Sequence, residues 1–303
     1  MLFQLHVYRF TFVARAPLFF PIGKAGNVFR GALGTCFRAL VCDPACVESS
    51  ACPMKDCAYA RLFSPRQPDG PSGFADAPRP FVLRAGHLDG RRLATGEAFT
   101  LDAHIFDLTE PAVQYFALAF TRLLDEGLGP GRGSVELVRI EAAGEVLFSE
   151  GRFCRDEHPA PLTLDLSEAL AGRRVRVEFL TPTEIKAEGE IVRVPPFAAL
   201  FARVRDRISN LRTLYGDGPL DVDFRAQVER AAAVRVTRSH LREEIVDRRS
   251  SRTGQRHSIG GSVGWVEYEG ALGEFLPYLR AGEYTGVGRQ TVWGKGSYRL
   301  SVI

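Results

Sequence analysis

A glycine-rich stretch near the end of the chain, residues 282–296, has the composition of a phosphate-binding loop. It holds five glycines and two cations within fifteen residues. Glycine takes positive φ angles and lets another chain approach closely, and successive backbone N–H groups can then form a concavity that binds a phosphate. The residues predicted to do so are Gly286, Gly288, Arg289, Gly294, Lys295 and Gly296. The alternative is a turn that only closes a helix–strand corner, because glycine-rich loops recur in unrelated folds.

Four cysteines in the first quarter of the chain have spacings that suit a metal site. They are Cys42, Cys46, Cys52 and Cys57. Four thiolates this close can surround one tetrahedral zinc ion, and an iron–sulfur cluster would use the same ligands. Such a site leaves no open position for chemistry, so a bound metal would be structural. The alternative is a set of reduced, buried cysteines.

The residues that must position these groups show the periodicities of helices and strands. In the first half, a strand, a helix, two strands, a second helix and a strand pair follow one another. The predicted ranges are 2–13, 27–40, 81–85, 97–106, 112–124, and 135–142 with 145–148. This order is that of the ferredoxin-like split βαβ motif.

The second half repeats the same order of elements. Its predicted ranges are 174–180, 197–215, 234–246, 258–269 and 272–279, with a last strand after the glycine-rich loop. The fold class is therefore α+β, with tandem ferredoxin-like domains over residues 1–170 and 171–303 and a cysteine-rich insertion at about residues 41–63 of the first.

Composition describes a soluble globular chain. It has 303 residues, 45% hydrophobic and 25% charged, and a net charge of +3. The most basic region, residues 235–256, carries seven arginines against three acidic residues. The first thirteen residues alternate like a strand rather than forming a signal peptide, and no apolar run is long enough to span a membrane. We therefore expect a cytoplasmic protein with no membrane partner. Disulfides are rare in the cytoplasm, so the cysteines are expected to be reduced or to bind a metal.

Several motifs resemble the CRISPR-associated endoribonucleases of the RAMP superfamily that process precursor crRNA. The glycine-rich stretch is similar to the C-terminal signature of that superfamily, and the cysteine pattern is similar to that of one branch. The other matching segments are Phe29–Gly34, Cys57–Phe63, Phe179–Lys186, and Ser251–Arg256 leading into Gly260–Gly264. The resemblance implies two ferredoxin-like (RRM-like) domains, binding of CRISPR repeat RNA, and one cut per repeat.

The resemblance also implies a reaction that needs no metal cofactor. The 2′-hydroxyl attacks the adjacent phosphate and leaves a 2′,3′-cyclic phosphate and a 5′-hydroxyl, so a base, an acid and charge stabilisation are required. Many family members place a catalytic histidine near the first helix, but this chain has none between His6 and His87. The resemblance to members that use Lys and Arg instead makes Lys24, Arg30 and Arg38 candidate catalytic residues, and the other candidates are His240 and His257 on the basic hairpin.

Four arginines at the tip of the basic region are predicted to bind RNA rather than to catalyse. They are Arg248, Arg249, Arg252 and Arg256, which suit the phosphates and narrow grooves of an RNA hairpin. One alternative is a non-catalytic RNA-binding subunit of a CRISPR effector complex, since the same fold serves both roles. Another is a metal-sensing or redox module built on the cysteines. The partners expected are repeat RNA and effector subunits, for a monomer or a homodimer.

Overall fold

The computed structural model of this chain describes residues 1–42, 57–65, 77–109, 112–155, 158–249 and 256–303. Within them the chain forms two compact units, which we call the N-terminal unit (Leu5–Leu162) and the C-terminal unit (Met1–Gln4 with Thr163–Ile303). Among the helices described, none has the length and apolar content needed to cross a membrane.

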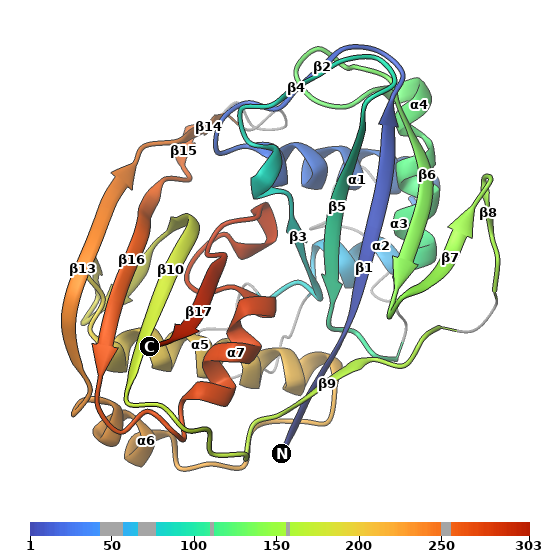
Figure 1. Cartoon of the computed structure of the whole chain (residues 1–303). Helices are drawn as coiled ribbons and strands as arrows, with labels where there is room; N and C mark the ends of the chain where they lie inside the picture. The colour runs from blue at the N-terminus through green and yellow to red at the C-terminus, as the bar shows by residue number, and fades with distance from the viewer. Residues whose placement is uncertain (43–56, 66–76, 110–111, 156–157, 250–255) are drawn as a thin grey trace. The chain divides into compact units, whose positions relative to one another are not determined.

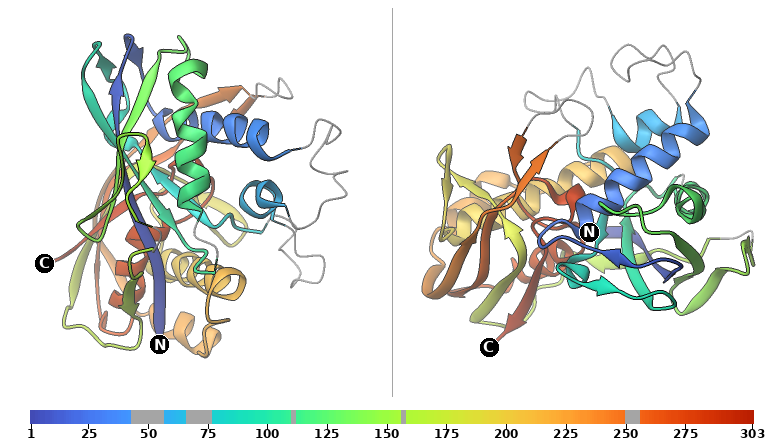
Figure 2. Two further views of the ribbon diagram at one scale, coloured as in Figure 1. Left: turned by 90° about the vertical axis from the view of Figure 1, so that its right-hand side faces the viewer. Right: turned by 90° about the horizontal axis from the view of Figure 1, so that it is seen from above.

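The N-terminal unit is built on an antiparallel sheet with helices on one face (Figures 1 and 2). Its central order, β3-β5-β1-β6, is that of a ferredoxin-like fold, and β7 and β8 extend the sheet beyond β6 while β9 pairs with β1. The elements are β1 (Leu2–Ala14), β2 (Leu18–Phe19), α1 (Ala25–Val41), α2 (Ala58–Phe63), β3 (Phe81–Arg84), η1 (Gly86–Leu88), β4 (Arg92–Leu93), β5 (Ala98–Ile105), α3 (Val113–Thr121), α4 (Leu123–Glu126), β6 (Val135–Ala142), β7 (Glu145–Ser149) and β8 (Arg152–Phe153). All but the first residue of β9 (Leu162–Asp165) belongs to the C-terminal unit.

Alternation along β1 decides which face of this sheet is buried. Phe10 and Phe12 are fully buried, and each packs edge-on against Phe120 of α3 at about 5.3–5.5 Å between ring centroids. Because side chains alternate between the two faces of a strand, one aromatic face of β1 is enough to fix the side on which α1 and α3 pack. The left view of Figure 2 shows both helices on that side.

The C-terminal unit repeats this architecture with a four-stranded antiparallel sheet in the order β13-β16-β10-β17 (Figure 1). Apolar residues on one face of β10, such as Val175 and Val177, are fully buried, as are Leu200, Val204 and Ile208 of α5. The elements are β10 (Arg174–Thr183), β11 (Ile185–Ala187), β12 (Glu190–Val192), α5 (Phe197–Tyr215), α6 (Phe224–Ala231), β13 (Arg235–Glu244), β14 (Asp247–Arg249), β15 (Arg256–Ser258), β16 (Gly261–Glu269), α7 (Leu276–Thr285), η2 (Thr291–Trp293) and β17 (Tyr298–Val302).

The tandem ferredoxin-like fold predicted from the sequence is confirmed, but the last helix was misplaced. It spans Leu276–Thr285 rather than residues 272–279, and Pro277 lies in its first turn. Proline suits that position because its missing N–H would have no intrahelical partner there. A further helix, α6, was not predicted from the sequence; its first turn is capped by the carboxylate of Asp223, which accepts from the N–H of Ala226. The cysteine-rich insertion, apart from its ends, lies outside the described residues.

Acid is expected to destabilise the N-terminal unit through His6. This residue is 5% exposed and stacks on Tyr8, and burial together with the charge of His158 lowers its pKa. Below an ordinary histidine pKa of about 6.5, the unfolded chain takes up a proton that the folded chain does not. The free energy of unfolding therefore falls with pH, by up to about 1.4 kcal/mol per unit, until the lowered pKa is reached.

Urea unfolding between neutral pH and pH 5 tests this expectation. The His6→Gln variant should lose part of the pH dependence, whereas His87→Gln, at an exposed histidine, should keep it. An unchanged slope in His6→Gln would show that His6 does not control the acid sensitivity.

Candidate functional site

The glycine-rich loop connects α7 to β17 and is held in one conformation by its own backbone. Gly286, Gly288, Gly294 and Gly296 all have positive φ angles, as predicted. The N–H of Val287 donates to the carbonyl of Gly296 at 2.9 Å. A Cβ on Gly296 would lie 1.9 Å from the carbonyl oxygen of Val287. Only glycine can therefore occupy this position without moving the backbone.

The loop is also packed against the residues that follow and end β10. The N–H of Gly296 donates to the carbonyl of Pro182 at 3.2 Å, and that of Ser297 donates to the hydroxyl of Thr181 at 3.0 Å. A Cβ on Gly288 would lie 2.2 Å from the carbonyl oxygen of Glu184. Residues 181–184 and the glycine-rich loop are far apart in the sequence, but these contacts pack them directly against each other.

The two cations of the loop have different surroundings. Arg289 is at the surface, with its side chain 57% exposed and its guanidinium 3.4 Å from the carboxylate of Glu184. Lys295 is only 3% exposed. The loop therefore offers Arg289 directly to a ligand, while Lys295 lies inside the fold, a difference that the spacing of the two residues did not reveal.

A residue missed by sequence reasoning ties the loop to its neighbour. Gln290 takes a left-handed conformation, with φ of 63°, and its side-chain amide donates to the carbonyl of Ser258 at 3.0 Å. Ser258 ends β15, in which His257 pairs with Arg248 of β14. The backbone of His257 therefore lies next to a contact with the loop. Glutamine rarely takes a positive φ angle, so this conformation at Gln290 could not be expected from the sequence.

The arginines predicted at the basic tip are partly described. Arg249 pairs with Arg256 in the ladder between β14 and β15, and Arg248 pairs with His257. Arg252 lies outside the described residues. The ladder brings the backbones of the three described arginines together at one end of the C-terminal unit.

His240 lies away from the loop, on β13. It pairs with Trp265 of β16, and their rings are 6.2 Å apart. Glu244 lies four positions further along β13, at the end of the strand where its partner Gly261 contacts the backbone of Thr183. At about 3.4 Å per residue, His240 is roughly 14 Å along the strand from that end. The structure thus brings His257, but not His240, next to the loop.

In the N-terminal unit, α1 spreads the three candidate cations along its length. Lys24 is the residue before the helix, and Arg30 and Arg38 lie within it. At a rise of 1.5 Å per residue, Lys24 and Arg38 are separated by about 21 Å, too far to share one phosphate. Arg30 places its guanidinium 5.6 Å from the centre of the Phe63 ring. The side chains therefore offer separate contacts rather than one cluster.

Two of the four predicted metal ligands, Cys42 and Cys57, lie among the residues that the structure describes. Cys42 ends α1, and the sulfur of Cys57 accepts from the N–H of Ala60 at the start of α2. Cys46 and Cys52 lie outside the described residues. Cys36, on α1, is buried, and burial raises the pKa of its thiol. The described part of the chain contains no group of three or more potential metal ligands, so it gives the predicted zinc no support.

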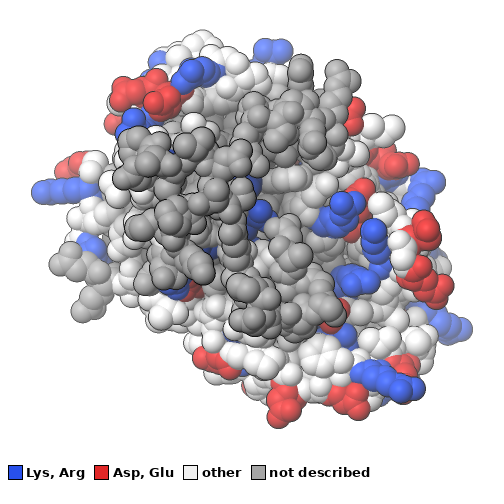
Figure 3. Space-filling view, turned by 180° about the vertical axis from the view of Figure 1, so that it is seen from behind, with Lys and Arg blue, Asp and Glu red and all other residues white. Residues whose placement is uncertain are grey.

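Many of the arginines are ion-paired, so a high arginine content does not by itself indicate a surface that binds a polyanion. Arg174 pairs with Glu269 at 2.9 Å, Arg176 with Glu267 at 2.6 Å, and Arg230 with Glu274 at 2.6 Å. Figure 3 shows cations and anions interspersed among the described residues of one face. Binding of a polyanion therefore depends on where particular arginines are exposed, not on their number.

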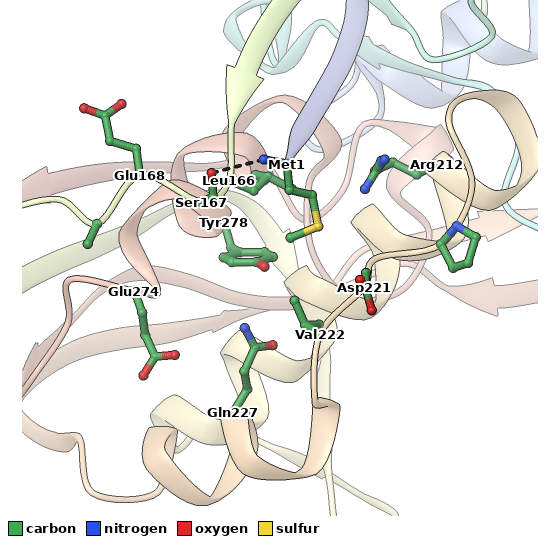
Figure 4. A pocket seen from close by; sticks show the side chains of 12 residues that line it. Met1, Leu166, Ser167, Glu168, Arg212, Asp221, Val222, Gln227, Glu274 and Tyr278 are labelled. Atoms are coloured by element: carbon green, nitrogen blue, oxygen red, sulfur yellow. Dashed lines mark hydrogen bonds between the residues drawn. The ribbon is translucent and has the colours of Figure 1, made fainter.

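The C-terminal unit also has a pocket of about 480 Å³ that contains none of the predicted site residues (Figure 4). Its lining includes Arg212 and Gln227 together with the acidic side chains of Asp221 and Glu274. Glu274 is already paired with Arg230. The mixed charge of this pocket does not favour a phosphate.

Comparison with known proteins identifies similar families and structures. Residues 3–159 match a family model described as the AF_1859_N N-terminal domain, and residues 177–298 match the model of the CRISPR-associated endoribonuclease Cas6. No curated protein sequence matches the chain.

Solved structures resemble this chain over almost its whole length. Thermus thermophilus Cas6 is 18% identical, with a TM-score of 0.56 over 98% of each chain. A Cas6 product complex gives the same identity and TM-score over 98% of this chain and 99% of that one. A partial Cas6-RT-Cas1–Cas2 complex is 12% identical, with a TM-score of 0.59 over 99% of this chain and 46% of that one. At these identities the structural likeness shows the fold alone.

Proposed function

We propose that this chain, whose residues 177–298 match the model of the CRISPR-associated endoribonuclease Cas6, is an endoribonuclease of that kind, which binds CRISPR repeat RNA and cuts precursor crRNA once within each repeat. The observation that carries the proposal is the glycine-rich loop, which lies inside the segment that matches the Cas6 model. The loop backbone is fixed by contacts to Thr181, Pro182 and Glu184, and the loop residue Arg289 has an exposed side chain. A rigid loop with an exposed cation suits the RNA backbone.

The proposed chemistry is transesterification within the RNA. The 2′-oxygen forms a bond to phosphorus as its proton passes to a base. The bond from phosphorus to the 5′-oxygen breaks as an acid supplies a proton, leaving a 2′,3′-cyclic phosphate and a 5′-hydroxyl. Cations and fixed N–H donors stabilise the additional negative charge in the transition state. No step requires a metal ion.

The residues proposed for these roles form two sets. In the C-terminal unit, His257 is the candidate for proton transfer because its backbone adjoins the loop contact at Ser258. In the N-terminal unit, Lys24, Arg30 and Arg38 are the candidates for charge stabilisation, although Lys24 and Arg38 cannot serve the same phosphate. The arginines of the basic tip are proposed to bind the RNA backbone.

Single-turnover cleavage of a repeat RNA by the chain alone tests the function. With enzyme in excess, we expect one defined cut, which His257→Ala slows and a substitution at one of Lys24, Arg30 or Arg38 also slows. Tight binding of RNA that stays intact would instead identify an RNA-binding subunit. Assembly with other CRISPR proteins, the monomeric or homodimeric state, and a structural zinc on the cysteine cluster remain predictions for purified protein.

Removal of Arg289 is expected to weaken RNA binding without disturbing the fold. Its contact with Glu184 is exposed and long, so its loss should cost at most about 1 kcal/mol of stability. If Arg289 contacts a phosphate, Arg289→Ala should reduce the slope of log Kd against log salt concentration by about 1, the change expected when one phosphate contact is lost.

Arg225→Ala is the matched control, because the Arg225 side chain is 90% exposed and forms an exposed ion pair with its helix neighbour Glu229. Filter binding over a salt series compares the two variants. Equal slopes for wild type, Arg225→Ala and Arg289→Ala would exclude a phosphate contact by Arg289.

A further inference from the structure

The sheet of the C-terminal unit has one face lined by polar and aromatic side chains, which we call the open face. The opposite face carries the buried residues Val175, Val177 and Phe179. The strand register places Arg176, Glu267 and Arg238 in one row of the open face, and Arg299, Glu178, Trp265 and His240 in the next.

The guanidinium of Arg176 lies over the ring of Trp265. Its Cζ lies 4.4 Å from the centre of the Trp265 ring. Both Nε and one Nη donate to the same carboxylate oxygen of Glu267, at 3.1 and 2.6 Å. Glu267 is only 4% exposed, so this anchor is rigid, whereas the Arg176 side chain remains 42% exposed. A fixed, planar and partly exposed guanidinium is a stacking surface for an unpaired nucleobase.

The surroundings of this stack suit a nucleic acid backbone. His240 is exposed, and its ring lies 6.2 Å from that of Trp265 at an interplanar angle of 31°, so it offers a second ring beside the stack. The three rows that pass through Arg174, Arg176 and Glu178 carry five arginines and three glutamates. Arg238 and Arg299 are both exposed on either side of the stack. A second copy of this face would meet like charge, so a polyanion is the favoured occupant.

We propose that the open face binds an unpaired segment of RNA, with one base stacked on the guanidinium of Arg176 above Trp265. His240 supports the neighbouring base, and the exposed arginines at the two edges neutralise phosphates. Stacking of this kind tolerates any base, because every base has a π-face. This binding surface is separate from the glycine-rich loop, and it rests on the proposed function only in taking RNA as the polymer.

A matched pair of conservative variants separates stacking from charge. Arg176→Lys and Arg174→Lys both keep the charge on the same face of the same strand, but only the first removes the guanidinium above Trp265. Binding of a labelled oligouridylate, followed by fluorescence anisotropy, should weaken roughly tenfold in Arg176→Lys. The change in Arg174→Lys, whose pair with Glu269 is exposed, should stay within about twofold.

Photocrosslinking locates the base without any substitution. An oligouridylate that contains 5-iodouridine should attach to the peptides that hold Trp265 or His240. Equal affinities of the two lysine variants, or adducts confined to other segments, would overturn the proposal. The proposal would also be overturned if the open face formed a dimer interface in the wild-type protein, shown by a dimer that dissociates in Arg176→Lys.

The outcome can be read independently of RNA cleavage. If wild type fails to cut the repeat but the oligouridylate distinguishes the two lysine variants, the proposed function fails and the open-face site stands. If wild type cuts the repeat but the two lysine variants bind the oligouridylate equally, the open-face proposal fails and the proposed function stands.

Discussion

A repeat RNA with a 2′-deoxy nucleotide at the cut site is expected to bind this chain and to remain uncut. The proposed reaction uses the 2′-oxygen as its nucleophile, so replacing the hydroxyl by hydrogen removes the attacking atom and leaves the rest of the RNA unchanged. Cleavage should fall to the background rate, while the Kd should stay within about threefold, because a single hydroxyl contributes little to a backbone-dominated affinity.

The product ends and the effect of a chelator complete this test. Wild-type cleavage in EDTA should leave a 5′-hydroxyl and a 2′,3′-cyclic phosphate, which labelling by a polynucleotide kinase and mass spectrometry can identify. A deoxy substitution one nucleotide away from the cut is the control and should not prevent cleavage. Cutting of the deoxy substrate, or a 5′-phosphate on the product, would show that water rather than the 2′-oxygen attacks phosphorus.

Gly296→Ala is expected to abolish most of the activity by deforming the glycine-rich loop. The added Cβ would lie 1.9 Å from the carbonyl oxygen of Val287, and this carbonyl belongs to the backbone and cannot rotate away as a side chain can. The hydrogen bond from the N–H of Val287 to the carbonyl of Gly296 would be lost with the shift. A displacement of about 1 Å at a catalytic site can cost on the order of a hundredfold in rate, and we expect a loss of this size.

Gly189→Ala is the matched control for the backbone conformation. Gly189 also has a positive φ angle and lies in the C-terminal unit, but nothing lies within 4 Å of the Cβ that alanine would add. Both variants should share the cost of a left-handed alanine, about 1–2 kcal/mol, and only Gly296→Ala should add the clash. Circular dichroism melts and single-turnover rates measure the two effects. Equal cleavage by the two variants would show that the loop conformation is not needed for activity.

Much of the fold could be predicted because it follows from local patterns. Apolar residues at helical spacing, including Leu200, Val204 and Ile208, predicted residues 197–215 as a helix, and α5 has those bounds. The alternation along residues 135–142 predicted β6 equally well. The order of these elements then indicated a ferredoxin-like repeat, since few topologies accommodate that order. Positive φ angles at the loop glycines also followed from residue type alone.

The candidate site was predicted less completely, because its features depend on contacts between distant parts of the chain. The sequence marked Arg289 and Lys295 as equivalent cations, but packing buried one and exposed the other. It grouped His240 with His257, whereas the strand register placed His240 opposite Trp265. Local spacing carries no information on which strands become neighbours, so neither result was accessible from it.

The sequence by itself therefore determined the type and order of the elements and the expectation of positive φ angles at the loop glycines, since both arise from steric limits and periodicities within short segments. The tertiary structure alone decided why Gly288 and Gly296 must be glycine, because the atoms that exclude a Cβ belong to Glu184 and Val287. It alone also brought Arg176, Glu267 and Trp265 together on one face, because cross-strand neighbours are set by sheet pairing rather than by distance along the chain.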